Sequence, residues 1–130
     1  AGPFMGQQGP VYAHPRLFEE LLKEFPDLKV IMAHMGGLEY IQDTLVLADS
    51  YPTLNFDCCG IFARGPELGG LSDEQIAELV RKVGAHRICF GSDWPWSDPN
   101  PAIQRIQGLP LAQEEKDSIL GRNALRILGL

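Results

Sequence analysis

Several features that assign a protein to a particular class are missing from this sequence of 130 residues. No apolar run approaches the ~18 residues that a membrane-spanning helix requires. Lys and Arg form no cluster, and the formal net charge of −6 argues against binding to nucleic acid or to an anionic membrane surface. Residues 1–10 have neither a basic segment nor a long apolar stretch, so no signal peptide is expected. These absences lead us to expect a soluble, cytoplasmic protein.

Cysteine is scarce, and the chain is short. Cys58, Cys59 and Cys89 are odd in number and lack C-x-x-C spacing, which fits a reducing compartment. We expect all three to be small buried residues rather than nucleophiles or zinc ligands.

A complete (β/α)8 barrel needs ~250 residues, and ~200 at the least. A whole barrel of this kind is therefore excluded.

The sequence does contain a regular alternation of helical and strand-like segments. Apolar residues at helical spacing, with Leu17, Leu21, Phe25 and Leu128 among those assigned to core faces, predict helices over 15–25, 38–48, 72–83 and 111–128. Ser72, with Gln75 three residues on, predicts a capping box at the start of the third helix. Short apolar runs predict buried strands over 29–34, 54–59 and 87–93, and the Pro-containing segments 1–14 and 94–110 are predicted to be loops. This order indicates an α/β fold with three parallel strands and flanking helices. So few strands leave two edges and a small core, which is typical of part of a larger sheet.

Three residues stand at the carboxyl ends of the predicted strands, where parallel α/β folds place their functional groups. They are His34, Cys59 and Asp93. An imidazole and a carboxylate at this end of a sheet could bind a divalent metal or share a proton transfer. Each also has a simpler explanation, because His34 could bond a backbone carbonyl and Asp93 could cap a turn.

The alternation of side chains along a strand bears on which residues face inward. If Asp93 points inward, Gly91 and Cys89 do so too. On the middle strand the inward set is either Leu54, Phe56 and Cys58 or Asn55, Asp57 and Cys59, and the sequence does not decide between them.

The remaining imidazole and indole side chains have less specific surroundings. His14 precedes Pro15 and is predicted to cap the first helix. His86 precedes the third strand and therefore belongs to the opposite, structural end of the sheet. Trp94 and Trp96 either line a pocket for an aromatic or carboxylate substrate or pack within their own loop.

Three segments carry a family pattern: Phe25–Gly37 (FPDLKVIMAHMGG), Gly84–Pro95 (GAHRICFGSDWP) and Asn123–Leu130 (NALRILGL). In this order and spacing they resemble the amidohydrolase-related proteins of the amidohydrolase superfamily. The likeness runs from about residue 12 to the end of the chain. That family includes metal-dependent hydrolases and decarboxylases of the aminocarboxymuconate-semialdehyde type.

The resemblance implies the C-terminal half of a (β/α)8 TIM barrel, with residues 1–130 forming a partial metal-dependent hydrolase domain that lacks the N-terminal strands. Asp93 matches the family's metal-ligating Asp on the eighth strand. His34 matches the sixth-strand His, which transfers protons or polarises the substrate and binds a second metal in binuclear relatives. The family's His-x-His pair is absent, and its fifth-strand His is expected just upstream of Ala1-Gly2.

The resemblance also implies a divalent metal, zinc by preference, that lowers the pKa of a bound water to ~7. The expected reaction is hydrolysis of an ester, lactone or amide of a small-molecule substrate. Decarboxylation is the alternative, and a non-catalytic, self-associating half-barrel is the alternative of another class. We expect the chain alone to be inactive, because His34 and Asp93 do not provide the three to four ligands of a zinc site. We also expect it to form a homo-oligomer or to associate with a missing N-terminal half.

Overall fold

The computed structural model describes residues 13–130, so most of the first predicted loop, including Ala1-Gly2, lies outside the described residues. Three strands form one sheet in the order β1 (Ile31–Met32), β2 (Asn55–Asp57) and β3 (Ile88–Cys89). Both pairings are parallel, with Met32 opposite Phe56 and Asp57 opposite Cys89. The predicted α/β class with three parallel strands is confirmed, although each strand is shorter than the apolar run that predicted it.

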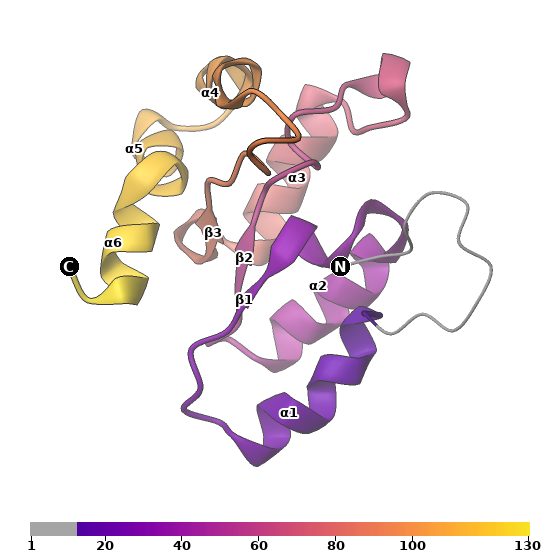
Figure 1. The fold of residues 1–130 in the computed structure, drawn as a ribbon, viewed down its shortest axis with the longest axis vertical. Coiled ribbons are helices and arrows are strands. Elements are labelled where there is room, and N and C mark those ends of the chain that lie inside the picture. Colours follow the sequence, from indigo (N-terminus) through magenta and orange to yellow (C-terminus); the bar gives the residue numbers. More distant parts are fainter. Residues whose placement is uncertain (1–12) are drawn as a thin grey trace.

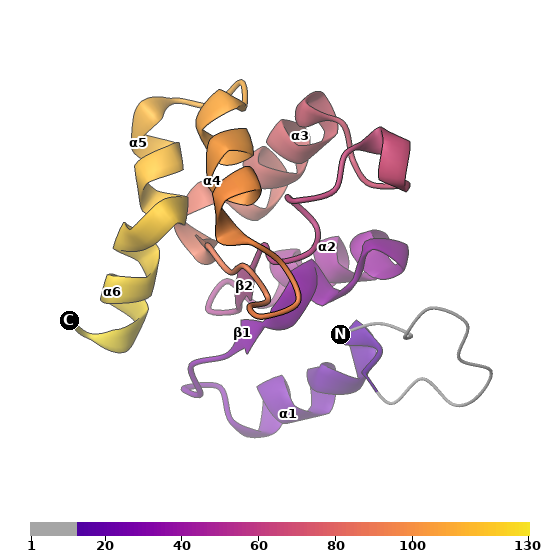
Figure 2. The same ribbon diagram turned by 45° about the horizontal axis from the view of Figure 1, so that its top comes forward.

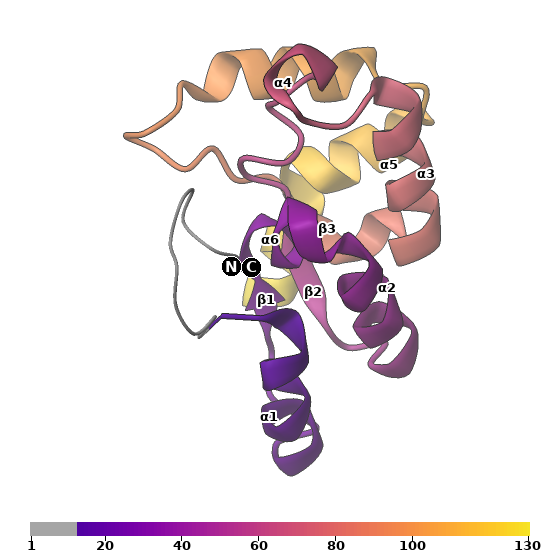
Figure 3. The same cartoon turned by 90° about the vertical axis from the view of Figure 1, so that its right-hand side faces the viewer.

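Six α-helices accompany these strands within residues 13–130: α1 (Phe18–Glu24), α2 (Ile41–Ser50), α3 (Asp73–Val83), α4 (Pro99–Gly108), α5 (Gln113–Asp117) and α6 (Asn123–Leu128). A π-helical turn, Ser118–Arg122, joins α5 to α6, so these two helices form the single final helix predicted from the sequence. The strands lie at the centre of the molecule (Figure 1). Viewed along the edge in Figure 3, α2, α3 and α5 lie on one side of the strands, and the loop from β3 to α4 projects on the other.

Two helix starts follow the capping chemistry expected from the sequence. The Ser72 Oγ accepts a hydrogen bond from the backbone N–H of Gln75, and the Gln75 Oε1 accepts one from the backbone N–H of Ser72. These reciprocal bonds are the predicted capping box of α3. His14 caps the 3-10 turn Pro15–Leu17 that leads into α1, since its Nδ1 accepts from the N–H of Arg16.

The prediction of a loop over 94–110 is wrong, because α4 occupies Pro99–Gly108. Prolines at 99 and 101 suggested an irregular segment, but both fall in the first turn, where the missing N–H has no helical partner to lose. The Asp98 carboxylate accepts from the N–H of Asn100 and caps the helix. Ala102 and Ile106 are the buried residues of the helix, and Figure 2 shows α4 lying beside α5.

The hydrophobic core lies between the sheet and the helices on its covered side. Leu54, Phe56 and Cys58 are at most 1% exposed, and Ile76 and Val80 of α3 are fully buried in the same cluster. This burial decides the orientation that the sequence left open. The other set of β2 and its extension, Asn55, Asp57 and Cys59, therefore faces away from the helices.

The helices at the two edges of the sheet are less covered than their sequences predicted. Four residues assigned to apolar core faces are exposed: Leu17, Leu21 and Phe25 around α1, and Leu128 in α6. β1 and β3 are the outer strands, and α1 precedes β1 while α6 contacts β3. The exposed apolar residues of α1 and α6 therefore lie at the two open edges of the three-stranded sheet.

The amino end of the sheet is closed by two buried polar side chains. The Arg87 guanidinium donates to the carbonyls of Val83, Ala48 and Tyr51. The Asn123 side-chain amide donates to the carbonyls of Ala85 and Ile88. These bonds attach the ends of α2, α3 and α6 to β3. None of the helices in residues 13–130 has both the length and the apolar content needed to cross a membrane.

Candidate functional site

The carboxyl ends of the three strands bring together the three residues selected from the sequence. His34 follows β1, Cys59 follows β2 and Asp93 follows β3. One ligand atom from each, an imidazole nitrogen, a thiol sulfur and a carboxylate oxygen, lies within 4.8 Å of the others. We refer to these residues as the His34–Cys59–Asp93 cluster.

The backbone turns sharply at two members of this cluster. His34 has φ 54°, the adjoining Met35 has φ 51° and Asp93 has φ 65°. Among the non-glycine residues of 13–130, only these three have positive φ. Such conformations cost of order 1–3 kcal/mol each and occur preferentially at functional sites. In this chain all three such residues lie at the carboxyl end of the sheet.

Asp57 connects two of the strand ends. Its Oδ1 accepts hydrogen bonds from the backbone N–H of His34 at 2.9 Å, the backbone N–H of Cys59 at 3.1 Å and the thiol of Cys59 at 2.7 Å. One carboxylate oxygen therefore fixes the turn after β1 and the turn after β2. Sequence reasoning did not single out Asp57, because the inward set on this strand was undecided.

The imidazole of His34 lies against Cys59. The His34 Nδ1 is 3.0 Å from the carbonyl oxygen of Cys59 and 3.3 Å from its sulfur. With a proton on Nδ1, the ring donates to the carbonyl and Nε2 remains available for other partners. Gly60, with φ +69°, makes room for the ring, since a Cβ at this position would lie 3.1 Å from Nδ1.

Cys59 is buried, as expected for all three cysteines, but its sulfur faces polar groups. Burial raises the pKa of the Cys59 thiol to about 12, and the hydrogen bond to Asp57 acts in the same direction because it stabilises the protonated form. The thiol is therefore protonated near neutral pH. Cys58, on the helix side, also has a pKa raised to about 12, chiefly by burial.

Asp93 and the two tryptophans form the exposed part of the site. Asp93 is exposed, and its carboxylate accepts no hydrogen bond from residues 13–130. The turn that follows is held instead by the Asp93 carbonyl, which accepts from the N–H of Trp96, and by the Ser92 hydroxyl, which accepts from the N–H of Trp94. Trp94 and Trp96 are 74% and 87% exposed, so neither side chain is buried within its own loop.

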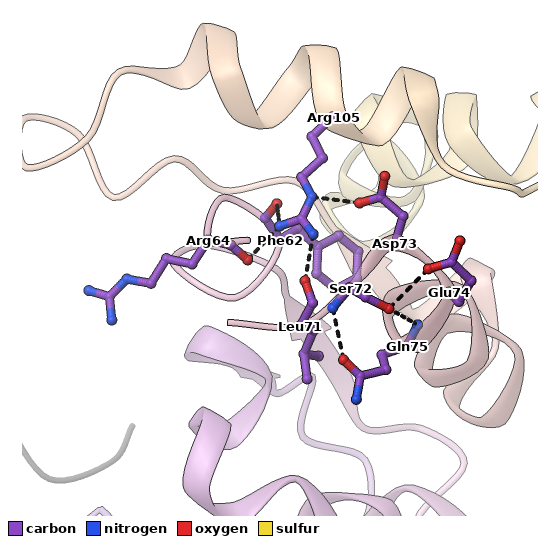
Figure 4. Close-up of polar contacts among 8 residues, drawn as sticks. All are labelled: Phe62, Arg64, Leu71, Ser72, Asp73, Glu74, Gln75 and Arg105. Carbon is purple, nitrogen blue, oxygen red and sulfur yellow. Dashed lines mark hydrogen bonds and ion pairs between the residues drawn. The ribbon is translucent and has the colours of Figure 1, made fainter. Parts of the chain in front are cut away.

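A separate hollow of about 380 Å³ lies between the β2–α3 loop and α4, and its lining contains no member of the cluster. Arg105 reaches into this region from α4 (Figure 4). Its guanidinium pairs with Asp73 at 2.8 Å and donates to the carbonyls of Phe62, Arg64 and Leu71. These bonds occupy the guanidinium, so Arg105 holds the loop against α4 rather than offering a charge to a ligand.

The chain is similar to known enzymes over part of their length. A γ-resorcylate decarboxylase of Rhizobium sp. is 25% identical over 134 residues, which cover 95% of this chain and 41% of the relative. The chain thus spans less than half the length of the relative that it matches.

Solved structures show the same fold. A TIM-barrel protein of Bordetella bronchiseptica has a TM-score of 0.74 at 22% identity, covering 91% of this chain and 40% of the other. A Burkholderia multivorans amidohydrolase with bound zinc has a TM-score of 0.71 at 16% identity, covering 90% and 49%. A Polaromonas dihydroxybenzoic acid decarboxylase with bound manganese has a TM-score of 0.62 at 18% identity, covering 95% and 48%.

A match to a family model identifies the family of this chain. The family model described as amidohydrolase matches residues 9–130, which include all three strands and the whole cluster. The chain therefore belongs to the amidohydrolase family and has the fold of about half of a TIM barrel, with His34, Cys59 and Asp93 at the carboxyl end of its strands.

Proposed function

We propose that this chain contributes Asp93 and His34 to the active site of a metal-dependent enzyme that acts on a small molecule. The observation that supports the proposal is the meeting of imidazole, thiol and carboxylate at the carboxyl end of the sheet. This is the end at which TIM-barrel enzymes carry out their chemistry. In this proposal residues 1–130 are part of a catalytic domain whose other strands lie upstream.

The donor set of the cluster suits a divalent cation. Imidazole nitrogen and carboxylate oxygen are ordinary ligands of zinc and of other transition metals. Asp93 would hold the cation, because its carboxylate is exposed and has no hydrogen-bonding partner in the described part of the chain. When bound, the cation supplies a Lewis acid that polarises a substrate oxygen and acidifies a water molecule. Zinc is our preferred metal, and similar folds are known with zinc and with manganese.

His34 would move a proton to or from the substrate. Its Nδ1 lies 3.0 Å from the Cys59 carbonyl, so the ring orientation and the tautomer are set by a backbone acceptor. This leaves Nε2 as the nitrogen that exchanges a proton with the substrate. Asp57 supports this role, because it holds the backbone of His34 in place.

Two reactions fit these roles. Hydrolysis of an ester, lactone or amide needs an activated water and a proton for the leaving group, and His34 would deliver that proton. Decarboxylation needs a proton at the carbon that loses carbon dioxide, and His34 would supply it there. The similarity to γ-resorcylate decarboxylase over 95% of this chain favours the second reaction for a hydroxybenzoate-like substrate. Trp94 and Trp96, exposed beside Asp93, would line the side of the pocket that receives the ring.

The apolar edges indicate a further polypeptide surface as partner. Leu17, Leu21, Phe25 and Leu28 are exposed on the β1 side, and Leu125 and Leu128 on the β3 side. Apolar side chains left exposed at both edges of a sheet are candidates for contact with another polypeptide surface. We propose that upstream barrel strands cover it in a longer protein, and that the 130-residue chain alone self-associates. Light scattering that shows a compact monomer at high concentration, without binding of a hydrophobic dye, would contradict this.

The reaction is tested in a longer protein that contains this chain and the upstream strands. Carbon dioxide release from dihydroxybenzoates and hydrolysis of esters, lactones and amides should be compared before and after removal of metal with a chelator. The proposal expects one of these activities to disappear with the metal and to return when it is added back. Activity that survives complete metal removal would contradict it. The 130-residue chain alone should be inert with both substrate classes.

A further inference from the structure

We propose that Arg64 binds the carboxylate of the substrate, and that the substrate is a small aromatic acid. Arg64 lies on the loop that connects β2, and Cys59 after it, to α3. The inference rests on the proposed function in placing the active site at the carboxyl end of the sheet. It adds the residue that selects a substrate with a negative charge.

The first argument is the availability of the charge. Within residues 13–130, every Lys and Arg of the chain except Arg64 donates a hydrogen bond from its side chain or forms an ion pair. Arg64 is exposed, and its guanidinium has no partner in this part of the chain. Its N–H donors are therefore available to an acceptor that the described residues do not supply.

The second argument is that the backbone of Arg64 is held in place. Arg105 donates hydrogen bonds to the carbonyls of Phe62 and Arg64. Phe62 is fully buried, and its N–H donates to the carbonyl of Cys58. Gly70 packs against the other side of this segment, since a Cβ at that position would clash with the Arg64 carbonyl. The side chain therefore extends from an ordered segment, which lowers the entropy cost of binding a ligand.

The third argument is direction. In Figure 4 the Arg64 guanidinium points away from Arg105, to the side of the picture on which the β3–α4 loop lies. That loop carries Asp93, Trp94 and Trp96. Both loops leave the carboxyl ends of their strands, where TIM-barrel enzymes bind their substrates. Arg64 and Asp93 thus belong to the same face of the molecule.

The chemistry of this face indicates which ligand Arg64 binds. A guanidinium matches a carboxylate, to which it donates two parallel N–H···O bonds. Asp57 and Asp93 place two carboxylates at this end of the sheet, and the formal net charge of the chain is −6. An anionic substrate therefore needs a cationic side chain beside it. The exposed Trp94 and Trp96 offer their ring faces to an aromatic group, so an aromatic acid suits both kinds of side chain.

The test uses the metal-loaded longer protein and two probes, benzoate and benzyl alcohol, which has the same ring without the charge. Neither probe is a hydroxybenzoate or contains an ester, lactone or amide bond, so both stay intact during a calorimetric titration. Arg64→Gln should weaken benzoate binding by at least about 10-fold, the lower end for loss of a hydrogen bond to a charged group. It should leave the binding of benzyl alcohol unchanged. Arg64→Lys keeps the charge but not the paired donors, so it should weaken benzoate binding less than Arg64→Gln does.

Arg81→Gln is the matched control, because it makes the same change of charge on α3, where Arg81 donates to the Pro110 carbonyl. It should leave the binding of both probes unchanged, and a loss of benzoate affinity as large as that of Arg64→Gln overturns the inference. Wild-type protein that binds benzoate no more tightly than benzyl alcohol overturns it, as does an Arg64→Gln variant with wild-type affinity for benzoate. Equal weakening of both probes by Arg64→Gln also overturns it, because Arg64 would then shape the pocket rather than bind the carboxylate.

The two proposals fail separately. Binding of the probes is measured at equilibrium without turnover, so failure of the metal-removal test leaves the result for Arg64 intact. Failure of the Arg64 prediction leaves the metal-dependent reaction to that test.

Discussion

The two ends of the parallel sheet use their polar groups in different ways. At the amino end, Arg87 and Asn123 are buried, and their donors meet backbone carbonyls from α2, α3 and β3. At the carboxyl end, Asp57 receives three hydrogen bonds, but the Asp93 carboxylate receives none from residues 13–130. The polar groups at the amino end are bonded within the protein, whereas the Asp93 carboxylate at the carboxyl end remains available to a ligand. We therefore expect substitutions at the amino end to change stability and those at the carboxyl end to change chemistry.

The largest loss of stability should follow Arg87→Ala. This change removes the donors of three backbone carbonyls and the cation above the Phe56 ring, 5.8 Å from its centroid. Buried acceptors without partners cost about 1–3 kcal/mol each when water cannot replace the donor, so we expect the free energy of unfolding to fall by about 2–4 kcal/mol. Urea denaturation measures it. Arg122→Ala is the control, because its pair with Asp117 is largely exposed and should contribute less than about 1 kcal/mol. If both substitutions lowered the free energy of unfolding equally, Arg87 would contribute no more to stability than an exposed arginine, which would contradict its role at the amino end of the sheet.

An intermediate loss should follow Asp57→Ala. Two backbone N–H groups lose their acceptor, but water can reach this end of the sheet, so we expect about 1–3 kcal/mol. Asp57→Asn is the matched control, since it keeps an acceptor oxygen of the same reach and should lose less than half as much. A variant of unchanged stability would show that Asp57 does not organise the two turns.

The smallest change should follow Asp93→Asn. The side chain is exposed and lacks partners in the described residues, and Asn accepts the left-handed backbone at φ 65°. We expect the free energy of unfolding to change by no more than about 0.5 kcal/mol. A larger loss in urea denaturation would show that Asp93 is structural, and the contrast between the ends would fail.

The fold was predictable from the sequence because its signals are local. Apolar runs gave the three strands, and Ser72 with Gln75 gave the start of α3. The sequence does not reveal α4, because the Pro-rich segment 94–110 favours a loop, although Pro99 and Pro101 both lie in the first turn of the helix. The exposed Leu128 was assigned to the core because helical periodicity shows that a face is apolar, not whether another element covers it.

The candidate site was predictable only in part. His34 and Asp93 stand at strand ends that the sequence locates, and the family pattern gave them roles. The position of Cys59 was visible, but its partners were not, since contact with His34 depends on the register of β1 against β2. Asp57 could not be selected, because strand alternation leaves the inward side undecided until the burial of Phe56 is known.

The most direct test of the carboxyl end as the site of chemistry compares His34→Asn and Asp93→Asn in the longer protein. Metal content and initial rates are measured for both variants. Asp93→Asn removes one negative charge from the metal's surroundings, so the account predicts loss of both metal and activity. His34→Asn should keep near-stoichiometric metal, because upstream ligands share that cation with Asp93, yet lose about 10²–10⁴-fold in rate. If His34→Asn strips the metal as completely as Asp93→Asn, His34 is a ligand there and the proposed division of roles is wrong. If neither substitution changes the rate, the assignment of this end of the sheet to catalysis is contradicted.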